Sequence, residues 1–120
     1  RGRTMRFMLL IYTNEADRPA WGTPEGDAEA EGYNAFHGEV TGRGVFQSGE
    51  PLLRVADAKS VRVRNGSATV TDGPAMQTAE QLGGYYLLDC RNLDEALELA
   101  AEIPGATFGT IEVRPVLELT

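Results

Sequence analysis

Residues 70–86 read Val-Thr-Asp-Gly-Pro-Ala-Met-Gln-Thr-Ala-Glu-Gln-Leu-Gly-Gly-Tyr-Tyr and connect two predicted strands through a polar segment. Val70 ends one apolar run and Tyr85 begins the next. Asp72-Gly73-Pro74 has the composition of a turn, and Gly83-Gly84 lets the backbone enter the second run. Because loops on a rigid scaffold often carry binding and catalytic side chains, this connection is the first place to look for function.

A β-hairpin is predicted immediately before this connection. Residues 61–70 alternate apolar and polar side chains around Asn65-Gly66, two residues that tolerate the positive φ angles of a tight turn. Residues 45–50 form a weaker predicted strand, interrupted by a glycine. The hairpin therefore brings Asp72 to the start of the polar connection.

Two helices are predicted, one before and one after these strands along the chain. Thr23-Pro24 indicates the start of the first, since threonine is a good N-cap and proline suits the first helical position; Gly42 and Gly44 end it. Asn92, with Glu95 three residues later, has the spacing of a capping box and starts the second. The apolar positions are Tyr33, Phe36 and Val40 in the first helix and Leu93, Ala96, Leu97, Ala100 and Ile103 in the second.

Three more strands complete the predicted sheet. Residues 7–12 and 85–88 are nearly continuous apolar runs, as expected of strands buried on both faces. Residues 110–114 alternate, so that Ile111 and Val113 face a core. The order strand, helix, strand, hairpin, strand, helix, strand predicts an α+β fold of two split βαβ units, the ferredoxin-like arrangement with an inserted β-hairpin.

This arrangement leaves one face of the sheet without helices. Two helices cover only one face, although the first and third main strands are apolar on both sides. A second copy of the sheet is the simplest cover, because a twofold dimer uses one self-complementary patch. We therefore predict a homodimer with its sheets face to face. A pocket is expected between the sheets or where strand ends meet loops.

The composition is that of an ordinary soluble domain: 120 residues, 42% hydrophobic and 24% charged. The 18 acidic and 11 basic residues give a formal net charge of −7, and the basic residues are scattered, which argues against nucleic-acid binding. No apolar run has the roughly 20 residues of a membrane helix, and no signal-peptide pattern is present, so we expect no membrane association and a cytoplasmic location. Residues 1–4 look like a tag remnant, and residues 5–120 are expected to form a single domain.

A set of motifs in this sequence matches a known family. The motifs are Asp72-Gly73-Pro74, Thr78, residues 80–85, residues 61–64 and residues 111–115. Together they resemble the YCII-related proteins of the DGPF type, over about residues 5–116. The resemblance implies a dimeric α+β barrel of ferredoxin-like subunits with an uncharacterised biochemical role. The departures from the family motif are Ala75, Gln77 and Ala79.

Asp72 and His37 are the candidate catalytic residues, and proteins of the wider family have been proposed to use a histidine and an aspartate as a pair. Asp72 lies at a strand end beside a Gly-Pro turn, where a partly desolvated carboxylate can act as a base; alternatively, it only holds the turn. His37 is the only histidine, so any imidazole chemistry must use it; alternatively, it is a half-buried helix residue without chemistry.

Glu80, Tyr12 and Arg114 are the candidate ligand-binding residues. Glu80 is expected to point into the loop of Asp72, so that two close carboxylates form an acid–base pair; alternatively, it caps the short turn of residues 78–81 or is solvated. Arg114 shares a strand face with Glu112 and could bind a polar ligand between the sheets or form a surface ion pair. Tyr12 is expected to be a core or dimer-face aromatic, with ligand stacking as the alternative. Neither zinc-type ligand spacing nor a phosphate loop occurs, so no metal or cofactor is expected.

Two functions fit these features. The first is the binding or transformation of a small molecule in a pocket at the dimeric barrel, with Asp72 and His37 as polar groups in an apolar wall. The second is a non-enzymatic accessory or regulatory module that engages a protein partner. Relatives of the DGPF type are often encoded beside extracytoplasmic-function sigma factors, which makes such a factor the partner that the resemblance implies.

Overall fold

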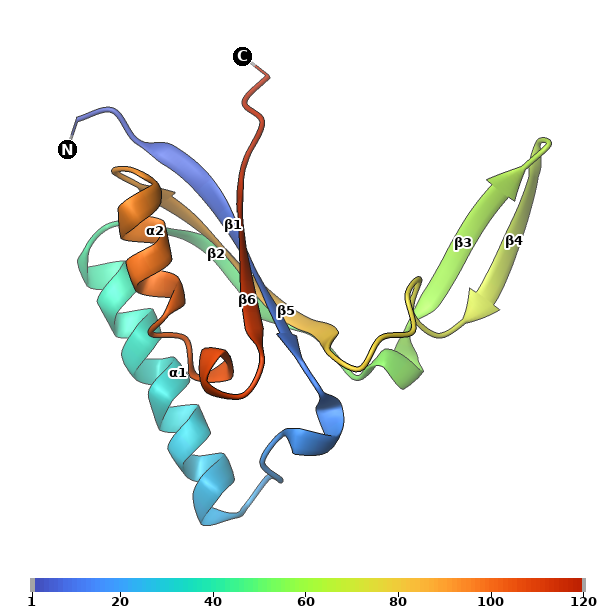
Figure 1. The fold of residues 1–120 in the computed structure, drawn as a ribbon, viewed down its shortest axis with the longest axis horizontal. Helices are drawn as coiled ribbons and strands as arrows, with labels where there is room; N and C mark the ends of the chain where they lie inside the picture. Colours follow the sequence, from blue (N-terminus) through green and yellow to red (C-terminus); the bar gives the residue numbers. More distant parts are fainter. Residues whose placement is uncertain (1, 120) are drawn as a thin grey trace.

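The computed structural model describes residues 2–119 and has one main antiparallel sheet in the order β2-β5-β1-β6. Two helices cover one face of this sheet (Figure 1). The strands are β1 (Met5–Thr13), β2 (Phe46–Pro51), β5 (Gln81–Cys90) and β6 (Thr110–Pro115), and the helices are α1 (Pro24–Gly42) and α2 (Leu93–Ala100). The predicted α+β, ferredoxin-like arrangement is confirmed.

The remaining two strands form the predicted hairpin, which stands apart from the sheet. β3 (Lys59–Arg64) and β4 (Ser67–Asp72) pair with each other and project from the body (Figure 1). Asn65 and Gly66 have φ angles of 51° and 77°, as the tight turn requires. We call residues 59–72 the hairpin arm. The short 3-10 helices are η1 (Glu15–Asp17), η2 (Val55–Asp57) and η3 (Pro104–Thr107).

Both helices begin at the predicted caps. The Thr23 hydroxyl accepts a hydrogen bond from the Gly26 N–H at 3.0 Å, and the Asn92 side chain accepts one from the Glu95 N–H at 2.9 Å. No helix in the described part of the chain is long and apolar enough to span a membrane.

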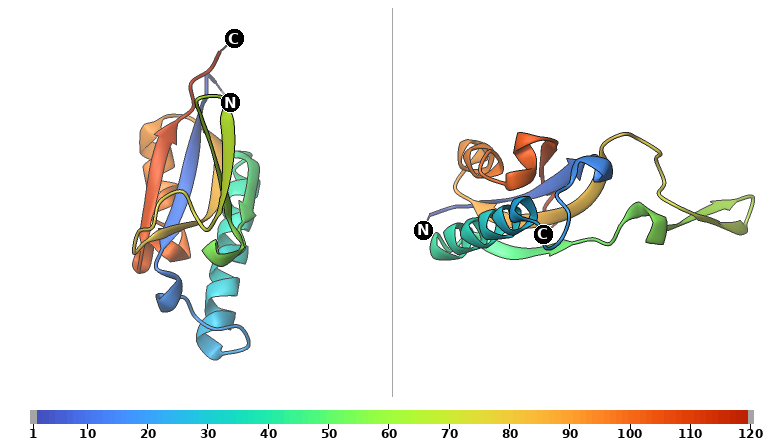
Figure 2. Two further views of the ribbon diagram at one scale, coloured as in Figure 1. Left: turned by 90° about the vertical axis from the view of Figure 1, so that its right-hand side faces the viewer. Right: turned by 90° about the horizontal axis from the view of Figure 1, so that it is seen from below.

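The core lies between the helices and the sheet. In β1, Phe7, Leu9 and Ile11 are buried there, whereas Met8, Leu10 and Tyr12 alternate onto the other face and are partly exposed. Within one chain, β1 is therefore buried on one face and not on both as predicted. Figure 2 (left) shows the helices behind the sheet and the arm in front of it. We call the side that carries Met8, Leu10 and Tyr12 the helix-free face.

The buried face of α2 differs in part from the prediction: Ala96 and Ala100 are buried as expected, and Ile103 is buried but lies beyond the end of the helix. Leu93 and Leu97 are about half exposed, at 47% and 48%, while Leu99 and Glu95 are buried. α2 has only eight residues, and the Glu95 carboxylate accepts a hydrogen bond from the Arg91 N–H at 2.7 Å. This bond holds Glu95 inward, so the helix turns a different stripe toward the sheet.

Gly83 and Gly84 lie inside β5 and not before it, as was predicted. A Cβ atom on Gly84 would lie 3.1 Å from the Glu50 carbonyl oxygen of the neighbouring strand. The register between β1 and β5 also shifts between Ile11 and Tyr12. A side chain at residue 84 would require the neighbouring strand to shift by a few tenths of an ångström, so this glycine suits close strand packing rather than a loop.

Candidate functional site

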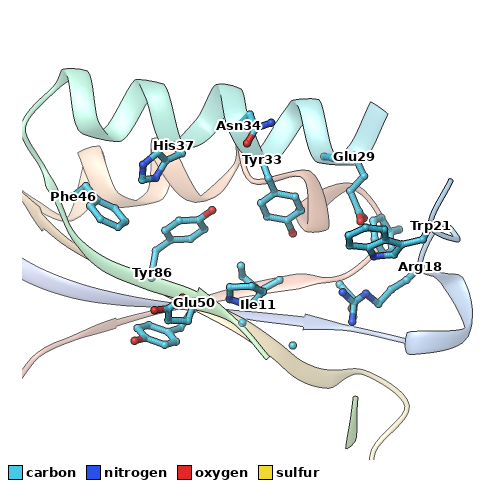
Figure 3. Close-up of a pocket in the computed structure, with 18 residues that line it drawn as sticks. Ile11, Arg18, Trp21, Glu29, Tyr33, Asn34, His37, Phe46, Glu50 and Tyr86 are labelled. Carbon is cyan, nitrogen blue, oxygen red and sulfur yellow. The ribbon is translucent and has the colours of Figure 1, made fainter. Parts of the chain in front are cut away.

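A cavity of about 450 Å³ lies between α1 and the β2–β5 edge of the sheet (Figure 3). Glu29, Tyr33 and His37 of α1 line one wall, because residues four apart lie on the same face of a helix. Phe46 of β2 and Tyr86 of β5 line the opposite wall. The volume falls within the roughly 300–1,000 Å³ of small-molecule sites. We call this space the α1 cavity.

One end of the α1 cavity is aromatic. The rings of Phe36 and Tyr86 meet edge to face with centroids 4.9 Å apart, and Phe46 and Tyr86 do so at 6.4 Å. His37 makes the same kind of contact with Phe46 at 4.9 Å. Edge-to-face pairs hold rings in defined orientations, so this end has a shaped, largely apolar wall.

Two tyrosine hydroxyls are directed into the space between α1 and the sheet, from opposite walls (Figure 3). Burial, together with the negative charge of Glu29, raises the pKa of Tyr33 to about 12, although a hydrogen bond from the Gly105 backbone acts in the opposite direction. Burial also raises the pKa of Tyr86. Both phenols are therefore protonated near neutral pH and can donate hydrogen bonds.

The other end of the α1 cavity is polar and open. Arg18, Trp21 and Glu29 gather there (Figure 3), and the Trp21 side chain is fully exposed. A Cβ on Gly83 would lie 3.8 Å from Nη1 of Arg18, so the guanidinium group lies against the β5 backbone. A positive and a negative group thus border the same entrance.

Glycine shapes the floor of the cavity beside Tyr86. A Cβ on Gly49 would lie 2.7 Å from Cδ1 of Tyr86 and 2.9 Å from the Tyr85 carbonyl oxygen. Real Cβ atoms essentially never approach so closely. The Tyr86 ring can therefore occupy its observed position because residue 49 has no side chain.

Comparison with known proteins identifies the family of this chain. The family model described as the YCII-related domain matches residues 5–120. The chain belongs to the YCII-related family. An uncharacterized protein of Rhizobium meliloti (strain 1021) is 33% identical over 114 residues, which cover 93% of this chain and 92% of that protein. The family resemblance is thus confirmed, while assignment to the DGPF type stays a prediction.

The two predicted catalytic residues of this YCII-related protein lie in different places. His37 is exposed and lines the α1 cavity. Asp72 ends β4 at the base of the arm, where its side chain is 85% exposed, forms an ion pair with Lys59 and does not line the α1 cavity. The structure therefore does not bring the two together within the chain. A catalytic role for either residue stays a prediction.

The predicted carboxylate pair of Glu80 and Asp72 is not present. The Glu80 carboxylate accepts a hydrogen bond from the Thr110 hydroxyl at 2.8 Å, whereas Asp72 pairs with Lys59. Glu80 immediately precedes β5 in the main sheet, while Asp72 belongs to the projecting arm. The fold thus gives each carboxylate its own partner.

Arg114, on the helix-free side of β6, is exposed and pairs with Glu112 at 3.6 Å. The surface ion pair, which was one of the two predicted alternatives, is therefore formed. Its side chains are 69% and 45% exposed, so it adds little to stability.

Tyr12 lines a second cavity, of about 630 Å³, at the base of the arm. Leu52, Met76 and Leu82 share this lining, so its wall is largely apolar. It lies where strand ends meet loops, one of the two predicted locations. The α1 cavity, in contrast, lies on the helix-covered side of the sheet and is built from one chain alone. No group of three or more potential metal ligands is found in residues 2–119.

Sequence reasoning missed most of the α1 cavity. Tyr33 was predicted only as part of an apolar helix stripe and Tyr86 as a core or dimer-face aromatic, and Arg18 and Glu29 were not named as site residues. The spacing of Glu29, Tyr33 and His37 is a usable signal, because it places three polar-tipped side chains on one helix face. No local signal points to Tyr86 or Arg18, which reach the cavity through sheet packing and loop geometry.

Proposed function

We propose that this YCII-related protein binds a small organic molecule in the α1 cavity. The observation that carries the proposal is the pair of protonated tyrosine hydroxyls, Tyr33 and Tyr86, directed into one cavity of about 450 Å³. A few polar groups set into a largely apolar wall are characteristic of small-molecule sites. Both hydroxyls keep a proton that they can donate, which favours a ligand that supplies an acceptor.

The lining supports a ligand with two distinct parts. A ring-shaped or otherwise flat apolar body fits against Phe46 and the Tyr86 ring, and an oxygen acceptor on it can reach the tyrosine hydroxyls. A polar end would lie at the entrance beside Arg18 and Glu29. Any imidazole chemistry on the bound molecule would use His37, because it is the only histidine in the chain.

The proposal includes a homodimer, formed through the helix-free face. Met8 and Leu10 of β1 stand in register with Leu87 and Tyr85 of β5, so four large side chains adjoin one another on that face. All four are only partly covered within one chain. A contiguous apolar face of this kind is typical of a protein–protein contact.

Trp21 offers a direct assay for the ligand. It is the only tryptophan and lies exposed at the entrance of the α1 cavity, so a bound molecule should change its fluorescence. A panel of ring-containing carboxylic acids, amides and ketones would be screened by thermal shift, because a ligand that binds only the folded chain raises the melting temperature. Hits would then be titrated by Trp21 fluorescence.

Matched variants locate the binding site. Tyr33→Phe removes one hydroxyl from the α1 cavity and should weaken binding about five- to tenfold, the effect of one lost hydrogen bond. Tyr12→Phe removes a hydroxyl on the other side of the sheet and should leave binding unchanged. Asp72→Asn should also leave it unchanged, because Asp72 does not line this cavity. Binding that survives Tyr33→Phe but is lost in Asp72→Asn would contradict the proposed site.

A further inference from the structure

The hairpin arm is exposed on both of its faces. Eleven of its twelve strand residues are exposed, and Ser60 alone is intermediate. No other helix or strand of the described chain makes a substantial contact with it. Its side-chain hydrogen bonds to residues beyond it run to the connection that follows it: the Ser60 hydroxyl donates to the Gly73 carbonyl at 2.8 Å and the Arg62 guanidinium to the Ala75 carbonyl at 3.4 Å. Since an isolated two-stranded hairpin is at best marginally stable in water, the arm needs a partner surface.

One face of the arm carries its apolar side chains, with the Lys59–Asp72 ion pair at the base of that face, and the other face is polar. Val61 pairs with Val70, and Val63 pairs with Ala68, so these four side chains share one face because cross-strand partners point the same way. The three valines are 59–63% exposed. We call this the valine face. The opposite face carries Arg62 and Arg64 with their cross-strand partners Thr69 and Ser67.

The solvent-accessible surface of a single chain is larger than that of a typical compact monomer of the same mass. It exposes 8138 Å², against about 6,300 Å² for a typical monomer of 13.0 kDa. Its radius of gyration is 16.3 Å, against about 14 Å for a compact domain of 120 residues. The excess of about 1,800 Å² is more than the roughly 800 Å² that each partner buries in a standard interface.

The arm and the body carry opposite charges. Residues 59–72 contain three basic residues and one acidic residue, a formal net charge of +2, which leaves −9 on the rest of the chain. A basic arm is attracted to an acidic body, and such complementarity favours the encounter of two copies. The arm also rises on the helix-free side of the sheet (Figures 1 and 2). A copy docked on that face is therefore within its reach.

We propose that the hairpin arm clasps a second copy of this chain, with its valine face packed against the helix-free face of the partner's sheet. This inference rests on the homodimer of the proposed function and adds that the hairpin arm stabilises the contact between the two copies. By twofold symmetry each copy gives one arm and receives one. The arginines remain on the outer face of the arm, where charged side chains prevent further sheet-like association.

Two lysine substitutions in β4 test this arrangement. Val70→Lys and Thr69→Lys add the same charge at neighbouring residues, but on opposite faces of the arm. Both positions are exposed within one chain, so both variants should fold, which circular dichroism and thermal melting would check. Sedimentation equilibrium should show that Val70→Lys raises the dimer dissociation constant about tenfold or more, whereas Thr69→Lys changes it less than about twofold.

Hydrogen exchange supplies a second measurement on the unaltered protein. The exposed amides of residues 59–72 should become protected at concentrations where the protein is dimeric and lose protection on dilution. If the protein is dimeric but the two lysine variants have the same dissociation constant, the proposed contact between the arm and the partner is wrong, while the proposed homodimer is supported. If the unaltered protein is a monomer at tens of micromolar, both the arm contact and the homodimer are wrong. Ligand binding in the α1 cavity is measured separately and decides the rest of the proposed function.

Discussion

The imidazole ring of His37 stands edge-on to the phenyl ring of Phe46, with centroids 4.9 Å apart and ring planes at 78°. His37 is exposed on α1, and Phe46 is partly buried against the core. The contact therefore places the only histidine of the chain at the wall of the α1 cavity in a defined orientation. The imidazole can contribute there in two ways, through the packing of its ring on Phe46 and through its nitrogen atoms, which can bind a ligand.

Substitution of His37 separates these two contributions. His37→Phe should keep the ring contact and the free energy of unfolding, whereas His37→Ala should lower that free energy by about 1 kcal/mol. Chemical denaturation would measure both. If the nitrogens contact a ligand, both variants should weaken its binding in the Trp21 fluorescence titration. Full affinity in His37→Phe would show that His37 serves the cavity by shape alone.

Tyr33 should make stability depend on pH in the alkaline range. An unfolded tyrosine ionises near pH 10, whereas burial raises the pKa of Tyr33 in the folded chain to about 12. Between these values the folded chain holds a proton that the unfolded chain has lost, so the free energy of unfolding falls as pH rises from 10 to 12. Below pH 10 this contribution is fully present. Urea unfolding at pH 9, 10.5 and 11.5 should show a smaller fall for Tyr33→Phe than for the unaltered protein.

Glu95 should contribute far more to stability than its neighbour Glu98. Both carboxylates contact Arg43, at 3.4 and 3.3 Å, but Glu95 is 4% exposed and Glu98 60%. Glu95→Ala leaves the Arg91 N–H and part of the Arg43 guanidinium without their acceptor and should lower the free energy of unfolding by about 3 kcal/mol. Glu98→Ala should lower it by less than about 1 kcal/mol. Equal effects in urea denaturation would mean that burial does not decide the difference.

Gly49 should resist substitution, whereas Gly38 should accept it. Gly49→Ala forces the Tyr86 ring or the Tyr85 carbonyl to move, and we expect the free energy of unfolding to fall by about 2 kcal/mol and ligand binding to weaken. Gly38 lies in α1 with open space around its Cα, so Gly38→Ala should raise the free energy of unfolding by about 1 kcal/mol. Thermal melting and fluorescence titration check both effects. An unchanged Gly49→Ala protein would contradict the packing of Tyr86 on residue 49.

Much of the fold was predictable because its signals act over a few residues. Thr23 and Asn92 cap their helices through backbone groups three positions away, and Asn65-Gly66 forms its turn through its own φ angles. The alternation of Ile111 and Val113 likewise follows from the period of a strand. Local propensity, periodicity and chain order together were enough to predict the ferredoxin-like arrangement.

The candidate site was less predictable because it depends on contacts between distant segments. His37 could be named from the sequence, but its neighbours Phe46 and Tyr86 are brought to it by strand pairing across the sheet. Asp72, a candidate because it begins the Asp-Gly-Pro turn, lies at the end of β4 on the projecting arm.

By itself, the sequence determined which segments form helices and strands, where the turns lie and in what order they follow, because those properties depend on neighbouring residues. Only the tertiary structure decided that Glu95 turns inward, that Gly83-Gly84 continue β5 and that Tyr33 and Tyr86 direct their hydroxyls into one cavity. These outcomes depend on packing and hydrogen bonds between segments far apart in the chain, which compete with local preference and at these positions outweigh it.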